Sequence, residues 1–118
     1  ALGEVKFLFP NAHDIYMHDT PTRDLFKKEM RAFSHGCVRV QDPRHFAEIV
    51  LGWDGAKVAR AIESRQSQTV PLPQKIPVYL NYFTAWPDES GAIVFYDDIY
   101  GRDTRLQKAL AKVTAATL

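Results

Sequence analysis

Short segments in which apolar and polar residues alternate are the feature that most constrains the fold of this chain. In residues 3–9, Val5, Phe7 and Phe9 occupy every second position, and this period is typical of a β-strand with one buried face. Residues 14–18 follow a Pro-Asn turn signal and predict a second short strand, which ends at a histidine. The start of the chain is therefore expected to form paired strands.

A second pair of alternating segments lies towards the end of the sequence. Residues 78–83 and 92–96 flank the segment Asp-Glu-Ser-Gly at residues 88–91, and this arrangement predicts a β-hairpin. The predicted fold class is mainly β with inserted short helices. The number of strands is low for a closed β fold, so we expect further strands before Ala1.

Helix start signals mark the inserted helices. Asp42 is followed by Pro43; Asp caps free backbone N–H groups, and Pro fits the first helical position. Asp54 offers a similar cap to the segment that follows it. Residues 105–113 predict a closing helix, and a short helical turn is expected around residues 25–26 within a polar loop.

Composition excludes some classes of function. The 118 residues suffice for one domain with a modest core, and no linker divides them, so residues 1–118 are predicted to form a single domain. The net charge is +1 with basic and acidic residues interspersed, and this argues against a nucleic-acid-binding surface. No apolar run approaches the roughly 18 residues that a membrane-spanning helix requires.

The chemistry of the chain is concentrated around its one cysteine, Cys37, which follows Ser34, His35 and Gly36. A thiol with a pKa of about 8.5 is mostly protonated near neutral pH, and an imidazole within hydrogen-bond reach can take its proton. His35 is two residues away and points to the same side in an extended segment. His18 ends a predicted strand, so the spacing alone leaves both histidines as candidates.

The neighbours of the thiol have roles of their own in this interpretation. Gly36 permits a backbone conformation that other residues avoid and lets a substrate approach closely. The N–H groups of Gly36 and Cys37 are placed to face the oxyanion of a tetrahedral intermediate. Arg39 is placed to bind a substrate carboxylate with two hydrogen bonds.

Less specific interpretations stand beside this one. A lone cysteine is more often a small buried apolar residue than a nucleophile, and Arg39 can simply pair with Asp42. His35 and Cys37 with a third histidine, such as His13 or His45, are also possible zinc ligands. A closed zinc site requires four ligands and the chain has no second cysteine, so we predict no metal.

The combined pattern resembles the signature of a known family, the L,D-transpeptidase catalytic domain with the YkuD-type fold. His18, a spacer of fifteen residues and Ser-His-Gly-Cys at residues 34–37, followed by Val38 and Arg39, match that signature. The flanking segments VKFLFPN, HDTP, RAF and VQDP extend the match. The distal segments PVYLNYFTAW and DDIYGRD resemble the large periplasmic branch of the family in Gram-negative bacteria. The resemblance covers nearly the whole chain.

The resemblance implies a YkuD-like β-sandwich or barrel that lacks its first strands, which an N-terminal segment or a second copy would supply. It implies that Cys37 is the nucleophile and that His18 is the base. The backbone carbonyl of Asp19 would orient the His18 ring. His35 and Gly36 would shape the oxyanion pocket with the Cys37 N–H. Arg39 and Ser34 would contact the substrate or hold the site.

The implied substrates are peptidoglycan stem peptides, with a tetrapeptide donor and an amine acceptor that together give a 3→3 cross-link. Carbapenems are the implied inhibitors, no cofactor is needed, and the implied location is the periplasm. Two other classes of function remain open. One is a stem-peptide-binding module without catalysis, and the other is a cysteine peptidase that passes the thioester to water.

Overall fold

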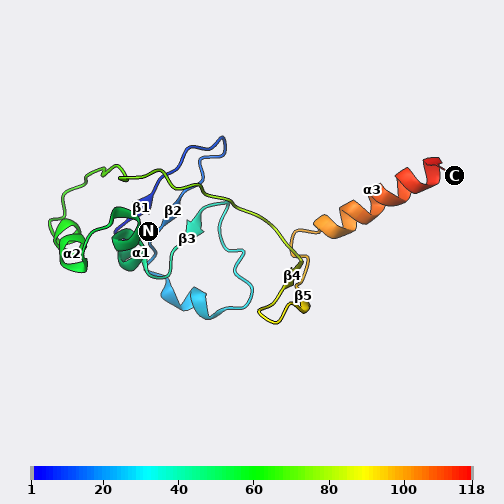
Figure 1. Ribbon diagram of the computed structural model, residues 1–118, viewed down its shortest axis with the longest axis horizontal. Helices are drawn as coiled ribbons and strands as arrows, with labels where there is room; N and C mark the ends of the chain where they lie inside the picture. Colours follow the sequence, from blue (N-terminus) through cyan, green and yellow to red (C-terminus); the bar gives the residue numbers. More distant parts are fainter. Residues whose placement is uncertain (1, 118) are drawn as a thin grey trace. The chain divides into compact units, whose positions relative to one another are not determined.

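A small mixed sheet brings the two halves of the signature together. In the computed structural model, which describes residues 2–117, β1 (Lys6–Phe7), β2 (Met17–His18) and β3 (Val38–Arg39) lie side by side in that order (Figure 1). β1 and β2 are antiparallel, with Phe7 opposite Met17. β2 and β3 are parallel, with His18 opposite Arg39. A parallel pair needs a long crossover connection, and the residues between β2 and β3 supply it.

Two helices follow the sheet as their start signals predict. α1 (Pro43–Leu51) begins where the Asp42 side chain accepts a hydrogen bond from the His45 N–H at 3.2 Å, and it ends at Gly52, which has a φ of 66°. α2 (Gly55–Glu63) begins where Asp54 accepts from the Lys57 N–H at 2.7 Å. The predicted helix starts and caps are confirmed.

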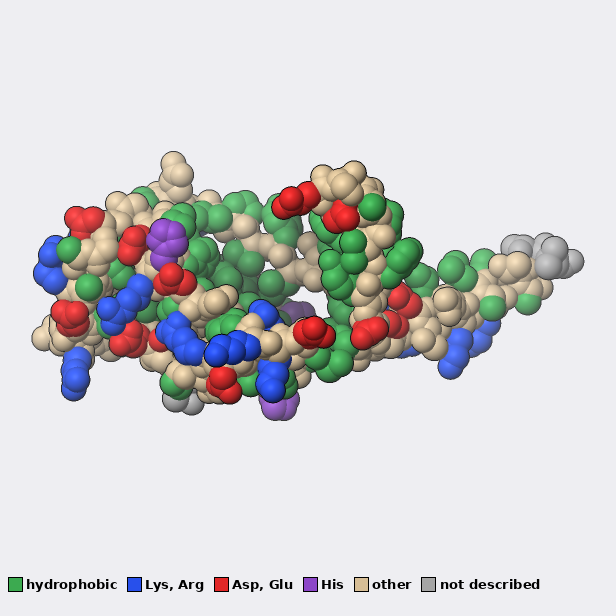
Figure 2. Space-filling view, turned by 90° about the horizontal axis from the view of Figure 1, so that it is seen from below, with side chains coloured by type: hydrophobic (Ala, Val, Ile, Leu, Met, Phe, Trp, Pro, Cys, Tyr) green, Lys and Arg blue, Asp and Glu red, His purple; other side chains and the backbone are tan. Residues whose placement is uncertain are grey.

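The apolar core of this part of the chain is small. The Phe7 ring of β1 packs on the Phe46 ring of α1 with centroids 4.7 Å apart, which joins the sheet to the helix. Among the described residues, the buried hydrophobic side chains are Ala47 and Val58, on the facing helices α1 and α2. Many larger apolar side chains are exposed, and hydrophobic atoms are open to solvent over much of the face seen in Figure 2.

The segment between β2 and β3 contains the expected helical turn. It is a 3₁₀ helix, η1 (Arg23–Lys27), and it includes Leu25 and Phe26. The predicted turn is confirmed. None of its residues is buried, so its placement depends on polar contacts at its start.

The chain divides into two compact units, Ala1–Val78 and Tyr79–Leu118. The second contains a hairpin of β4 (Ala85–Pro87) and β5 (Ile93–Phe95). The predicted turn at residues 88–91 and the predicted strand at residues 92–96 are confirmed, the latter as β5. The prediction of a strand over residues 78–83 was wrong, because the first strand of the hairpin is Ala85–Pro87. The Asp88 side chain accepts from the N–H groups of Ser90 and Ala92, so pairing begins at Pro87 and only three residues pair before the ladder ends.

In fold class, the described residues contain a three-stranded sheet, a two-stranded sheet and three α-helices, and most residues lie outside helices. The strands are two or three residues long. A β-sandwich or barrel and a single domain over residues 1–118 stay predictions. In the same part of the chain, no helix combines the length and apolar character needed to cross a membrane.

The closing helix α3 (Arg102–Thr117) starts on a polar network. The Asp98 carboxylate accepts from the Tyr82 hydroxyl at 2.6 Å and from the backbone N–H groups of Arg102 and Asp103 at 2.9 Å each. The hydrogen bond from Tyr82, with those from the helix N–H groups, lowers the pKa of Asp98 below its ordinary value of 3.8. Asp98 thus joins the start of α3 to the segment before the hairpin.

This network predicts an acid transition confined to α3. Because the folded-state pKa of Asp98 is depressed, its stabilisation is present above 3.8 and is lost as the pH falls through the lower folded-state value. We expect the Cα chemical shifts of the first turn of α3 to move towards coil values in that range. Asp98→Asn should abolish this titration. Asp88→Asn is the control, because the pKa of Asp88 is also lowered, by its hydrogen bond from Ser90, but Asp88 lies in the hairpin turn. A transition of the same size and midpoint in Asp98→Asn would contradict the assignment.

Candidate active site

The Cys37 thiol lies in a pocket of about 430 Å³. One side is formed by residues 33–37 with Arg39, and the other side is formed by residues 13–15. Cys37 is half-buried, and its Sγ lies 4.0 Å from the Asp14 carbonyl oxygen. The predicted residues Ser34, His35 and Gly36 are thus brought together with Cys37 and Arg39 at one concave surface.

A tight turn presents the thiol at the start of β3. The Ser34 hydroxyl donates to the Cys37 carbonyl at 2.7 Å and accepts from the Gly36 N–H at 3.2 Å. Gly36 has a φ of 142°, and a Cβ added there would lie 3.2 Å from Ile15 Cγ1. The turn therefore depends on glycine for both backbone conformation and space. The Ser34 hydroxyl is used within the turn, and its predicted contact with substrate stays a prediction.

The opposite side of the pocket is shaped by Asn11, which the sequence analysis identified only as part of a turn signal. Its Oδ1 accepts from the N–H groups of His13 and Ile15 at 3.0 Å each. Its Nδ2 donates to the carbonyls of Phe9 and Ile15 at 3.0 and 2.6 Å. These four hydrogen bonds hold residues 13–15 at the pocket, with Asp14 at a φ of 53°.

His18 is buried, with 5% of its surface exposed, at the end of β2. Its Nδ1 donates to the Asp19 carbonyl oxygen at 2.5 Å; since a carbonyl only accepts, the proton of a neutral ring is on Nδ1 and Nε2 is left as an acceptor. The Tyr16 ring lies beside it with centroids 5.8 Å apart. The contact between His18 and the Asp19 carbonyl is the one that the sequence analysis expected.

The register of β2 and β3 relates His18 to the thiol. His18 is opposite Arg39, and the N–H of Val38 donates to the Tyr16 carbonyl at 3.0 Å. Because residues two apart on a strand share a face, Cys37 lies on the same face as Arg39, diagonal to His18. Within residues 2–117 no hydrogen bond joins His18 to Cys37. Catalytic hydrogen bonds often form only when substrate is bound.

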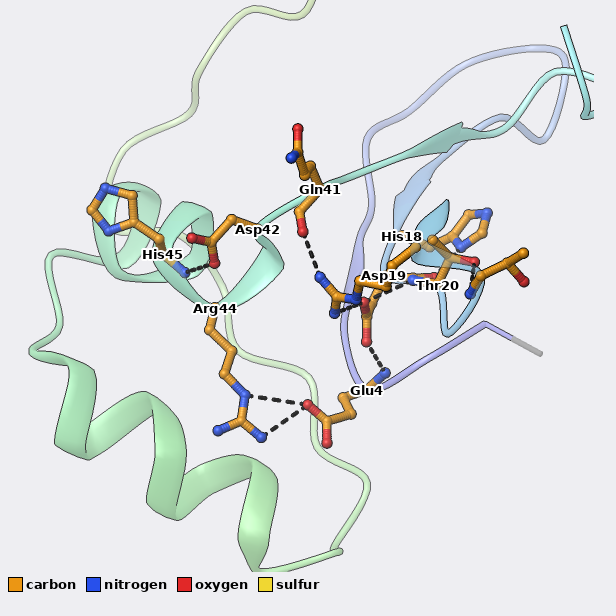
Figure 3. A network of polar contacts seen from close by, with 10 residues as sticks. Glu4, His18, Asp19, Thr20, Gln41, Asp42, Arg44 and His45 are labelled. Carbon is orange, nitrogen blue, oxygen red and sulfur yellow. Dashed lines mark hydrogen bonds and ion pairs between the residues drawn. The ribbon is translucent and has the colours of Figure 1, made fainter. Parts of the chain in front are cut away.

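The Asp19 side chain makes His18 part of a larger polar network (Figure 3). Its carboxylate accepts from the Glu4 N–H at 2.8 Å and the Thr20 N–H at 2.7 Å, and its own N–H donates to the Val5 carbonyl at 2.9 Å. A Cβ on Gly3 would lie 2.3 Å from Asp19 Oδ2, so only glycine allows this approach. His18, Asp19 and Thr20 are the buried polar residues of the described chain.

Two alternatives from the sequence can be compared with the structure. Among the described residues, Arg39 forms no ion pair, and the Asp42 carboxylate caps α1 instead. His35 is exposed at the pocket, and His45 lies 3.6 Å from a Glu48 carboxylate oxygen on α1. No group of three or more His, Cys, Asp or Glu side chains in residues 2–117 is arranged to hold a metal ion.

Comparison with known proteins bears on this arrangement. The family model of the L,D-transpeptidase catalytic domain, YkuD, matches residues 1–61, which include the pocket, His18 and Asp19. The chain is 42% identical over 112 residues to a protein of Haemophilus influenzae named "Putative L,D-transpeptidase", a match that covers 92% of this chain.

The chain belongs to the L,D-transpeptidase catalytic-domain family.

This confirms the resemblance drawn from the sequence. The chain spans 23% of the length of the Haemophilus relative, so it corresponds to a part of that protein. The YkuD match lies within the first compact unit, Ala1–Val78, which also contains every predicted site residue.

Gly36 gives a direct test of the site geometry. Gly36→Ala places a Cβ at a φ of 142° and 3.2 Å from Ile15, so we expect it to destabilise this unit by about 1–3 kcal/mol and to change the alkylation rate of Cys37. The measurements are thermal unfolding and iodoacetamide kinetics followed by intact mass. Gly91→Ala is the matched control, because Gly91 has a φ of 86° but nothing within 4 Å of an added Cβ. Equal effects of the two variants on alkylation would show that the turn does not control the thiol.

Proposed function

We propose that this chain carries the catalytic centre of a peptidoglycan L,D-transpeptidase, with Cys37 as the nucleophile. The observation that supports the proposal most directly is the pocket around Cys37, which gathers Ser34, His35, Gly36 and Arg39. On the neighbouring strand His18 is held with Nδ1 on the Asp19 carbonyl. A thiol in a concave site, with an imidazole of fixed tautomer on the neighbouring strand, suits covalent acyl transfer once the two are brought together by bound substrate.

In the first half-reaction His18 Nε2 takes the thiol proton as the donor stem binds. The thiolate of Cys37 attacks the carbonyl carbon at the L-centre of the third residue of the tetrapeptide stem. The Cys37 N–H would stabilise the oxyanion, because the Gly36 N–H already donates to Ser34 Oγ. The C–N bond then breaks, His18 returns the proton to the leaving amine, and D-alanine departs.

In the second half-reaction an amine of a second stem attacks the thioester. His18 takes a proton from the amine, the C–S bond breaks, and the thiol is restored when that proton passes to sulfur. The product is an amide, the 3→3 cross-link. Arg39, half-buried in the pocket, would bind the carboxylate of the donor, and exposed His35 would shape the oxyanion side. A periplasmic location follows from the same proposal, because peptidoglycan lies there.

Acylation by a carbapenem tests the nucleophile, because its strained amide presents a similar electrophile to the thiol. We expect one covalent adduct by intact mass and none with Cys37→Ser. His18→Ala should slow acylation by about 10²- to 10⁴-fold, the usual contribution of a general base. His45→Ala is the control histidine, since His45 lies on α1 beside Glu48, and it should leave the rate unchanged.

Each outcome of that experiment has a definite meaning. An adduct that persists in Cys37→Ser would refute the assigned nucleophile. No adduct together with fast iodoacetamide labelling would favour a module that binds stems without catalysis. An unchanged rate in His18→Ala would remove His18 from the mechanism.

The fate of the thioester distinguishes transfer from hydrolysis. With a tetrapeptide stem and an added amine, we expect the amide product to predominate over the free tripeptide acid. The measurement is product mass with increasing amine, because the ratio depends on how well the acceptor groove excludes water. Acid as the main product at saturating amine would make the chain a cysteine peptidase.

A further inference from the structure

One arginine outside the sequence signature contacts the ends of both strands that carry the site. Arg23 begins η1, in the crossover between β2 and β3. Its Nη2 donates to Asp19 Oδ1 at 2.9 Å, and its Nη1 donates to the Gln41 carbonyl at 2.5 Å. Asp19 follows β2 directly, and Gln41 lies two residues beyond β3. Nothing in the sequence pattern distinguished Arg23 from the other charged residues of this loop.

We propose that Arg23 is a positioning residue that holds the ends of β2 and β3 together and thereby fixes the His18 ring relative to Cys37. The proposal rests on the proposed function, in which His18 serves Cys37.

Asp19 is a buried carboxylate that depends on Arg23 for its partner charge. Its side chain is 5% exposed, and its only ion pair within residues 2–117 is with Arg23. A buried carboxylate requires a partner charge and hydrogen bonds, and Arg23 provides the charge while Glu4 and Thr20 provide backbone N–H groups. The position of the Asp19 residue, including the carbonyl that receives the His18 Nδ1–H, is fixed by this set of contacts (Figure 3).

Arg23 also supports the spacing of β2 and β3. β2 and β3 have only two paired residues each, so few backbone hydrogen bonds keep them in register. Past His18 the Val40 N–H donates to the His18 carbonyl at 2.9 Å, and the Arg23 guanidinium spans the next gap, from Asp19 to Gln41. Since His18 and Cys37 are on different strands, a shift between these strands changes their separation directly.

The bridge requires an arginine side chain at position 23. Arg23 uses two separate nitrogens for two partners, and the planar guanidinium holds them in a fixed arrangement. Lysine has one nitrogen on a flexible stem, so it can keep the charge beside Asp19 but cannot reproduce the fixed bridge to Gln41. Arg23→Lys therefore keeps the charge but loses the bridge, whereas Arg23→Met loses both.

The chain provides a matched control in Arg44. Arg44 donates to Glu4 Oε2 from Nη2 at 3.0 Å and from Nε at 3.3 Å. Its side chain is 44% exposed, and that of Arg23 is 52% exposed. Figure 3 shows this pair beside the Asp19 network. It joins α1 to the segment before β1 and contacts neither Asp19 nor Gln41, so Arg44→Met removes an arginine–carboxylate pair, here with the exposed Glu4 carboxylate, and leaves the bridge in place.

The test measures carbapenem acylation and the His18 tautomer in the same proteins. We expect Arg23→Met to lower the maximal acylation rate by about 10- to 100-fold, with the inhibitor concentration for half-maximal rate changed much less. Arg23→Lys should recover part of the loss, and Arg44→Met should match the wild type. Long-range ¹⁵N correlation spectra, assigned with His18→Gln, should show the Nδ1–H form in wild type and Arg44→Met. The Nε2–H fraction should rise in Arg23→Met.

The two readouts keep the proposals separable. If the wild type forms no adduct, the proposed function fails, while the tautomer shift in Arg23→Met still decides whether Arg23 positions His18. If Arg23→Met behaves as Arg44→Met in both rate and tautomer, the positioning role is refuted. If Arg23→Met does not fold, Arg23→Lys carries the test, and a wild-type rate with an unchanged tautomer in that variant overturns the requirement for a bridge.

Discussion

The buried Asp19 carboxylate is the interaction on which the rest of the candidate site depends. It accepts hydrogen bonds from the segment before β1, from its own neighbour Thr20 and from Arg23. The backbone of the same residue pairs with Val5 and receives the His18 Nδ1–H. A side chain with so many polar partners resists displacement because each broken contact would leave a buried polar group unsatisfied. In a chain with a small apolar core, this polar cluster sets the geometry at the end of β2.

The parallel pairing of β2 and β3 relates the Asp19 cluster to the Cys37 thiol. It places β2, which ends at His18, beside β3, which begins directly after Cys37. In this register His18 is opposite Arg39. The crossover between them contains a hydrogen bond from the Arg23 N–H to the Pro21 carbonyl. It ends in the turn at Ser34, whose hydroxyl donates to the Cys37 carbonyl. The thiol itself is held from the other side by the Asn11 loop, whose Asp14 carbonyl faces Sγ. The pocket is formed by residues 13–15 and 33–37 with Arg39 of β3. Hydrogen bonds between backbone groups and the side chains of Asn11 and Ser34 hold the two loops.

Many large apolar side chains of the described residues are exposed. The described chain buries Ala47 and Val58 but leaves side chains such as Phe95 and Leu8 at 78% and 70% exposure. Apolar surface of this extent is a feature of interaction surfaces, and the chain corresponds to 23% of its Haemophilus relative. That a further segment or a second copy completes the sheet stays a prediction. The exposed apolar side chains accord with it.

Local chemistry made part of this protein predictable from sequence alone. The caps at Asp42 and Asp54, the turn at residues 88–91 and the grouping of Ser34, His35, Gly36 and Cys37 depend on neighbours within a few residues. The family could be recognised because its signature is a spacing along the chain. Tertiary structure alone decided that His18 is diagonal to Cys37, that residues 13–15, held by Asn11, line the pocket and that Arg23 spans Asp19 and Gln41. It also shortened the hairpin that alternation had extended to residue 78. These features depend on contacts between residues far apart in the sequence, and no local pattern specifies which distant group will satisfy a given donor or charge.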